Sequence, residues 1–269
     1  MPSMEFRPWT NLYQPSVDYI ATKWAHLVET HPPAVIEFIG TLLVHFGTFW
    51  FVSLIFLSLD LLSWPSLQRH KIQALSRQPD HAAIKRCLVS ALYNELITTS
   101  LHLLQLLLLH FLGRPQVTYR IPAELPRLSE FLTEIAFCTM GREILFYYGH
   151  RLLHHPSIYS RFHKQHHKFR TPIALASQYA HPVEHVVSNI IPVAWPARAF
   201  NVHILTLWCF MAGVITQASL AHSGYHLLGV FGWRAKVHDL HHELLNVNYG
   251  VIGFLDYVHG TRYFRRKKD

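Results

Sequence analysis

Cysteine is scarce in this chain of 269 residues, which contains only Cys87, Cys138 and Cys209. The number is odd, the three residues are far apart, and each lies in or beside an apolar segment. This pattern argues against a disulfide framework. We interpret the three cysteines as small buried apolar residues of a protein in a reducing setting.

Several familiar motifs are also missing. The sequence has no G-x-S-x-G elbow, no P-loop and no G-x-G-x-x-G fingerprint, so no nicotinamide or flavin site is predicted. No cleavable signal peptide is predicted either, because residues 1–33 contain five prolines and no apolar core of the needed length. We therefore expect the first hydrophobic run to stay in the protein as a membrane anchor.

Acidic residues are outnumbered, with 16 Asp and Glu against 24 Lys and Arg, a net charge of +8. Such a balance can indicate nucleic-acid binding, but no Arg-rich groove with interleaved aromatic residues is present. Half of the residues are hydrophobic, and the basic residues lie beside apolar runs. This arrangement favours a membrane protein with a positive cytoplasmic side and no nucleic-acid partner.

Four apolar stretches suggest membrane helices. Residues 34–62 and 88–112 are long enough for a hydrocarbon core of about 30 Å, which needs about 20 helical residues. Residues 128–149 form a third span, and residues 186–221, interrupted by prolines, suggest two shorter helices that enter the membrane and return. The basic loop 63–87 then faces the cytoplasm. The predicted fold class is all-α, an integral-membrane helical bundle of about four spans.

The third predicted span ends at His150 and places a histidine-rich helical cap on the cytoplasmic side. Asn94 and Glu95 lie within the second predicted span. Because an ionisable group at membrane depth normally avoids lipid, we expect these side chains to face the interior of the bundle.

Half of the 22 histidines form four clusters at helical spacing. Positions three and four residues apart share one face of a helix, so each cluster can aim two or three imidazoles at one point. Neutral imidazole binds iron, zinc, copper and nickel. Histidines used simply as polar caps near a membrane surface are the alternative, but four such clusters are hard to obtain by chance. The predicted metal ligands are His150, His154, His155, His163, His166, His167, His222, His226, His238, His241 and His242.

This number of imidazoles predicts two metal ions, since one zinc ion usually takes four ligands. The histidines of 163–167 are expected to share one helical face, as are those of 238–242. His155 is five positions after His150, so on a regular helix its side chain points away from the face that carries His150. Pro156 could distort the helix and turn His155 toward that face.

Five further residues are candidates for supporting the ligands. Neutral ligands leave the cations uncompensated, which favours nearby carboxylates. Glu143 lies two turns before His150, where it could accept from a ligand imidazole or pair with Arg142. His185 and the unclustered histidines are expected at the surface or in helix contacts. The supporting candidates are Glu143, His181, Glu184, Asp239 and Asp256.

The motifs resemble those of the fatty acid hydroxylase/sterol desaturase superfamily, which includes the C-4 methylsterol oxidases. The similar portion runs from about Trp64 to Thr261 and contains, in order, HRLLHH, HKQHH, HSGYH and HDLHH. Many relatives carry Asp or Asn at the position of His226. The resemblance implies a membrane-bound oxygenase with two iron ions that hydroxylates a C–H bond of a lipid, such as a sterol or an isoprenoid-like molecule. It also implies the endoplasmic reticulum membrane, histidine clusters facing the cytoplasm, and electrons from cytochrome b5 and its reductase.

On this basis the chain divides into an N-terminal segment, 1–33, and membrane anchor helices with their loops, 34–127. A fatty acid hydroxylase-like catalytic domain, 128–261, and a basic tail, 262–269, complete it.

The segment from Asn246 to Gly250 departs from the methylsterol oxidases, which usually have Gly before the Asn-Tyr pair and none after it. It looks closer to the fatty-acid-hydroxylase-domain branch, so a tailoring oxidase or desaturase of a specialised pathway remains an alternative. A non-catalytic metal-binding membrane scaffold is a second alternative, which the intact clusters disfavour. A metal transporter is disfavoured, because it would need ligands at the midplane of several spans. The clusters here lie at span ends and outside the spans.

Overall fold

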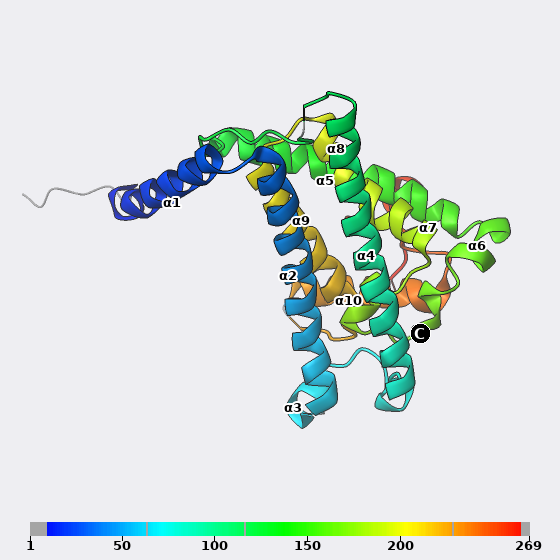
Figure 1. Ribbon diagram of the computed structural model, residues 1–269. Helices are drawn as coiled ribbons and strands as arrows, with labels where there is room; N and C mark the ends of the chain where they lie inside the picture. Colours follow the sequence, from blue (N-terminus) through cyan, green and yellow to red (C-terminus); the bar gives the residue numbers. More distant parts are fainter. Residues whose placement is uncertain (1–9, 63, 116, 228, 265–269) are drawn as a thin grey trace, which may run out of the picture.

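The computed structural model describes residues 10–62, 64–115, 117–227 and 229–264, and every regular element in these ranges is a helix. The predicted all-α class is confirmed. Two long helices, α2 (Pro33–Leu62) and α4 (His81–Phe111), run side by side away from a cluster of shorter helices (Figure 1). The last five residues of the predicted basic tail lie outside the described ranges.

Helix α2 matches the first predicted span. Pro33 occupies its first position, where the missing N–H costs nothing, and Pro65 follows its end. Large apolar side chains such as Leu43 (67 % exposed) and Phe51 (69 %) point away from the protein. An exposed apolar surface as large as that of α2 is unusual on a soluble protein, so we infer that α2 lies in lipid.

Helix α9 (Ile204–Ala221) packs along α2. In the described part of the chain, α2 and α9 are the two helices long and apolar enough to cross a membrane. The sequence predicted about four spans, and the other two do not meet this criterion.

The two remaining predicted spans do form long helices, α4 and α5 (Leu128–Leu153). Asp80 caps α4 by accepting a hydrogen bond from the Ala83 N–H. Asn94 and Glu95 of α4 are buried, as predicted, and a carboxylate oxygen of Glu95 lies 2.8 Å from His45 Nδ1. These polar groups reduce the hydropathy of α4, which is why it differs from α2.

The Pro-interrupted stretch 186–221 forms α8 (Ile191–Ala199) and α9, as two helices instead of one. Asn201 has φ 47°, and this left-handed residue lets the chain reverse between them. The return brings His222, at the end of α9, to the level of the other histidines.

One long helix was not predicted. α1 (Thr10–Thr30) extends away from the bundle and is joined to it through Trp24, whose indole N–H donates to the Pro122 carbonyl (Figure 1). The remaining helices have 15 residues or fewer. They are α3 (Pro65–Gln68), η1 (Leu75–Arg77), α6 (Pro156–Phe162), η2 (His166–Lys168), η3 (Ala174–Gln178), α7 (Pro182–Glu184), η4 (His185–Ile190), α10 (Val230–Leu244) and α11 (Phe254–Val258). Of these, η4, α6 and α11 contact α5.

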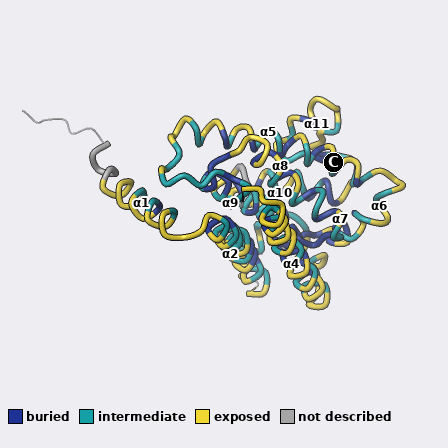
Figure 2. Tube along the Cα trace, turned by 45° about the horizontal axis from the view of Figure 1, so that its top comes forward, coloured by how far each residue is buried: buried dark blue, intermediate teal, exposed yellow. Residues whose placement is uncertain are grey.

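Burial is concentrated where these short helices meet α5 and α9, whereas the outer faces of α1, α2 and α4 are largely exposed (Figure 2). The buried polar side chains include most of the clustered histidines. These histidines are therefore polar side chains held inside the protein, which needs a chemical explanation.

Candidate metal centre

Five histidines bring one ring nitrogen each to a common point. The Nε2 atom of His163 lies 3.1 Å from that of His150, 2.9 Å from that of His154 and 3.0 Å from that of His167. The Nε2 atoms of His154 and His241 are 3.2 Å apart. We call these residues the first group: His150, His154, His163, His167 and His241.

Four other histidines form a second group in the same way. The Nε2 atom of His222 lies 3.3 Å from that of His166 and 2.8 Å from that of His238, and the Nε2 atoms of His238 and His242 are 3.1 Å apart. The second group is His166, His222, His238 and His242. The groups adjoin, because the ring centroids of His167 and His242 are 4.7 Å apart.

Backbone carbonyls fix which nitrogen of several rings carries the proton. His150 Nδ1 lies 2.8 Å from the Tyr249 carbonyl oxygen, and His241 Nδ1 lies 2.7 Å from that of Val247. In the second group, His222 Nδ1 is 2.8 Å from the Ala218 carbonyl oxygen. A carbonyl oxygen can only accept, so Nδ1 donates in each case and leaves the Nε2 lone pair facing the other rings.

This arrangement fits a bound cation. His166 Nδ1 donates to Tyr179 O and His222 Nδ1 to Ala218 O, so their two Nε2 atoms are both acceptors and cannot hydrogen-bond to each other. Neighbouring nitrogens about 3 Å apart match the edge of a coordination sphere with metal–nitrogen distances of about 2.0–2.1 Å. All-imidazole donor sets suit iron, zinc, copper or nickel.

Burial keeps these ligands neutral. Loss of solvent lowers the pKa of His222 to about 4 and that of His154, which also has His150 beside it, to about 2. Loss of solvent also holds the pKa of His163 well below its usual range. The rings are therefore in the unprotonated form that metals bind.

Local chain geometry distributes the histidines between the groups. In α10, His238 and His242 are four residues apart and enter the second group, while His241 enters the first. The prediction that the histidines of 163–167 share one helical face is wrong. Helix α6 ends at Phe162, His163 caps it, and a tight 3₁₀ turn follows. That turn sends the adjacent residues His166 and His167 to different groups.

Two predicted ligands lie outside both groups. Pro156 ends α5 and begins α6, and His155 becomes the exposed N-cap of α6, with Nδ1 2.7 Å from Ser157 Oγ. The break at Pro156 thus turns His155 away instead of bringing it in. His226 is exposed in the loop after α9, and its backbone N–H donates to the His70 carbonyl.

Three predicted carboxylates support the first group. A Glu184 oxygen lies 2.8 Å from His163 Nδ1. Asp256 accepts hydrogen bonds from the Tyr249 and Gly250 N–H groups, and Glu143 accepts from three N–H groups at 251–253. Glu143 therefore does not contact His150; it holds the segment whose Tyr249 carbonyl does.

Gly250 is required in this closing segment, which we define as residues 247–253. A Cβ atom at this position would lie 2.8 Å from a carboxylate oxygen of Asp256 and 2.8 Å from one of Glu143. The glycine of the Asn-Tyr-Gly sequence is thus explained by two converging carboxylates.

The other two supporting candidates, Asp239 and His181, bond to residues outside the two groups. Asp239 accepts a hydrogen bond from Gln73, whose amide also donates to the Arg170 carbonyl. Gln73 was missed by the sequence analysis, because no local pattern marks a contact across 166 residues. His181 caps α7 by accepting from the Val183 N–H.

His185 was expected at the surface, but it is 1 % exposed. It lies in the π-helix η4, where its ring meets Thr98 Oγ1 at 2.7 Å and Asn189 Nδ2 at 3.1 Å. The wider turn of a π-helix rotates His185 inward, and such turns are frequent at functional sites.

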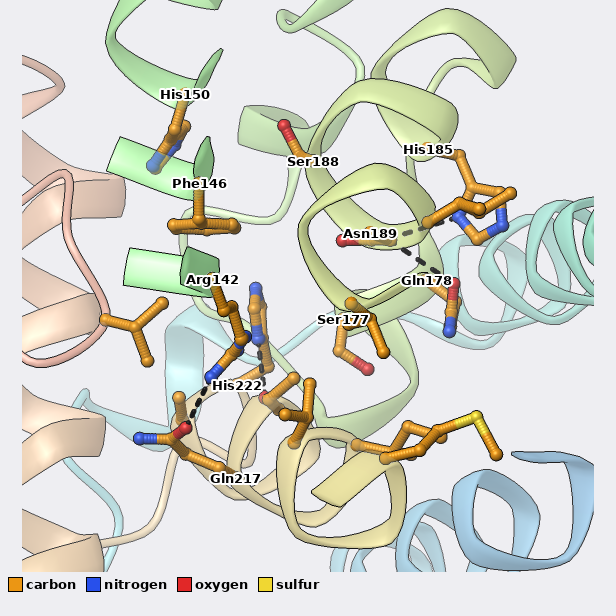
Figure 3. Close-up of a pocket in the computed structure, with 18 of the residues that line it drawn as sticks. Arg142, Phe146, His150, Ser177, Gln178, His185, Ser188, Asn189, Gln217 and His222 are labelled. Atoms are coloured by element: carbon orange, nitrogen blue, oxygen red, sulfur yellow. Dashed lines mark hydrogen bonds between the residues drawn. The ribbon is translucent and has the colours of Figure 1, made fainter. Parts of the chain in front are cut away.

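A cavity of about 270 Å³ begins at the histidines and continues between α2, α4 and α9 (Figure 3). Its lining includes His150 and His222, extends to Leu207 near the start of α9, and also includes Arg234 of α10 and residues 250–253 of the closing segment. The 15 residues from Leu207 to His222 correspond to about 22 Å of helix. The cavity is therefore long enough for an extended lipid.

The chain is similar to several known proteins. A family model described as fatty acid hydroxylase matches residues 135–261. The chain is 36 % identical over 247 residues to the Homo sapiens fatty acid hydroxylase domain-containing protein 2, covering 89 % of this chain and 71 % of that protein. It is 31 % identical to the very-long-chain aldehyde decarbonylase GL1-8 of Oryza sativa subsp. japonica, covering 92 % and 93 %. It is 30 % identical to methylsterol monooxygenase 2-2 of Arabidopsis thaliana, covering 93 % and 95 %. No solved structure matches the chain.

Proposed function

Because the chain belongs to the fatty acid hydroxylase family, a family of oxidoreductases, we propose that it is a membrane-bound di-iron oxygenase that hydroxylates a C–H bond of a lipid. The observation that carries the proposal is the pair of adjoining groups of inward-facing Nε2 atoms beside a long cavity. That cavity also reaches between the apolar helices α2, α4 and α9, where a lipid could arrive from the bilayer.

The first group would hold one iron ion through five imidazoles, and the second group would hold the other through four. Bound iron would supply the reaction with dioxygen that amino-acid side chains cannot perform. The second group contributes fewer ligands, which would leave a position open for a small molecule.

The protein residues orient the ligands and exclude water. Carbonyls of Tyr249, Val247 and Ala218 accept from Nδ1 of three ligand rings and keep each lone pair directed inward. Met211 and Ile215 form an apolar part of the cavity wall that accommodates hydrocarbon and disfavours bulk water.

The reaction needs electrons from outside. One dioxygen, two electrons and two protons convert a C–H bond to C–OH and release one water. No nucleotide-binding motif occurs in the sequence, so we propose that cytochrome b5 and its reductase supply the electrons. With a net charge of +8, the chain would attract an acidic partner, and partner-limited turnover should fall as salt rises past about 0.1 M, where the Debye length is about 10 Å.

We propose the endoplasmic reticulum membrane as the location, with the metal centre facing the cytoplasm. The basic loop after α2 supports this orientation by the positive-inside rule. A reporter fused in this loop should give a cytosolic signal, and one fused near Gly113 a lumenal signal. Identical signals at the two positions would contradict the proposed topology.

The substrate we propose is a sterol or another isoprenoid-like lipid. Membranes containing the protein should convert it in heavy dioxygen to a hydroxylated product that carries the label, and omission of cytochrome b5 or its reductase should stop the reaction. A product whose new oxygen comes only from water would contradict the oxygenase proposal.

A further inference from the structure

Helix α1, which the sequence did not predict, has one apolar face along residues 17–28. Apolar side chains recur there every three or four positions, which places them on the same side of the helix. They are Val17, Ile20, Trp24, Leu27 and Val28. The opposite side carries polar residues at the same spacing, and all of them are exposed: Asp18, Thr22, His26 and Glu29.

The two ends of the apolar face have different surroundings. Trp24 is 6 % exposed, and together with Val28 it packs into the buried cluster that contains Ile204 at the start of α9. Val17 and Ile20, by contrast, are 46 % and 57 % exposed. None of the buried clusters in the described ranges includes these two residues. The part of the face that extends beyond the bundle is therefore not covered by the described chain.

The position of α1 indicates what covers this face. Helix α2 begins at Pro33, soon after α1 ends at Thr30, and its exposed apolar surface begins in its first two turns with Val35 and Ile39. The edge of the hydrocarbon layer at this end of α2 is therefore close to α1. Figure 1 shows α1 running crosswise to α2 and away from the bundle, at the end of α2 opposite to α3. A helix in this place meets the surface of the bilayer.

The composition of α1 also fits a membrane surface. Although it has 21 residues, it is not one of the two helices apolar enough to cross a membrane. A helix with one apolar face and one charged face lies in the plane of the interface. Tyr19 is 64 % exposed, and Lys23 Nζ lies 5.5 Å from the centroid of its ring. Aromatic rings and long basic side chains are the groups that settle at the level of the lipid headgroups.

A second copy of the chain is a poorer partner for this face. A stable interface between proteins buries about 800 Å² on each partner. The exposed part of the apolar face consists of three aliphatic side chains, which offer far less area: Val17, Ile20 and Leu27.

We propose that α1 is an interfacial helix whose apolar face enters the bilayer surface beside α2. Its partner is the boundary between headgroups and acyl chains, which such helices enter by about 5–10 Å. The inference goes beyond the proposed function and does not depend on the metal centre. Trp24 donates to the Pro122 carbonyl and packs against the start of α9. An α1 held at the interface would therefore fix the depth of α9, and with it the level at which the cavity lies in the bilayer.

Fluorescence quenching of the full chain in lipid nanodiscs tests the proposal. The background variant is Cys209→Ser, because Cys209 is exposed, and a fluorophore is attached to one new cysteine at a time. At Ile20→Cys, a nitroxide on the upper part of the lipid acyl chain should quench several-fold more than iodide in water. At Thr22→Cys, on the opposite side of α1, iodide should quench more. A nitroxide at the end of the acyl chain should quench less at Ile20→Cys than the upper one.

A matched pair of charges assigns the effect to the apolar face. With the fluorophore at Val17→Cys, the added substitution Ile20→Asp should remove most of the quenching by lipid. Thr22→Asp adds the same charge on the polar side and should leave that quenching within about twofold. Metal content and thermal unfolding report whether each variant has folded, and both should remain as in the background variant, because Ile20 and Thr22 are exposed.

Equal quenching by iodide at Ile20→Cys and Thr22→Cys would overturn the proposal, because α1 would then stand clear of the membrane. Equal quenching by lipid at both positions, or stronger quenching at Ile20→Cys by the deeper nitroxide, would contradict an interfacial position. Protection of Ile20→Cys from every quencher, with more than one chain in each nanodisc, would assign the face to a second copy. Failure of the heavy-dioxygen experiment would refute the oxygenase and leave the position of α1 unaffected.

Discussion

The two histidine groups differ in what supports them. The first group has five rings and is supported by two carboxylates that hold the closing segment and by Glu184. The second group has four rings and is positioned by helix ends and by the Ala218 and Tyr179 carbonyls. We infer that the first group is the more rigid site. The second group is the more open site, where a bound metal would exchange ligands during the reaction.

Removal of a ligand should have the largest effect and should separate the groups. His241→Ala in the first group and His166→Ala in the second should each reduce hydroxylation at least about 100-fold, because loss even of a residue supporting a ligand costs about 10–100-fold. His226→Ala, outside both groups, should stay within about twofold of wild type. Activity of the three variants in membranes checks this, and full activity in either ligand variant would contradict the assignment.

Gly250→Ala should damage the first group alone. Its Cβ would meet oxygens of both Asp256 and Glu143, so the closing segment has to move and the Tyr249 carbonyl leaves His150. We expect about a tenfold loss of activity. Gly213→Ala on α9 is the control, because nothing lies within 4 Å of its Cβ position. Equal effects of the two substitutions would show that the closing segment is not a support.

Glu184→Gln should weaken the first group less. The carboxylate beside His163 Nδ1 is replaced by a neutral amide of the same size. Iron affinity of the first group should fall about tenfold, with the second group unchanged. Chelator titration of the purified variant measures this, and loss from the second group first would reverse the comparison.

The smallest effect is expected at a buried ion pair near the second group. Lys71 Nζ lies 2.6 Å from Asp60 Oδ1 and 4.0 Å from the Tyr225 ring, and the adjoining Ile72 N–H donates to the Gly224 carbonyl. Burial lowers the pKa of Lys71, and Asp60 opposes this shift. Lys71→Met should lower second-group iron affinity a few-fold by loosening the loop after His222, and an unchanged affinity would exclude this role.

Where spacing acts within one helix, the sequence predicted which histidines converge. His238, His241 and His242 all lie on α10 and turn inward, but His241 enters the first group and the other two enter the second. His155 lies outside both groups, since the consequence of Pro156 depends on how the next helix begins. Gln73 and the inward turn of His185 depend on long-range contacts and on a π-helix, neither of which has a local signal.

Iron content of the purified wild-type protein tests the central claim most directly. Two adjoining groups of neutral imidazoles should retain two iron ions per chain, and His238→Ala and His241→Ala should each retain one. Metal analysis by mass spectrometry that finds two ions in wild type and one in each variant would support two separate sites. A single ion in the wild type, or loss of both ions from either variant, would contradict the account of two sites with different support.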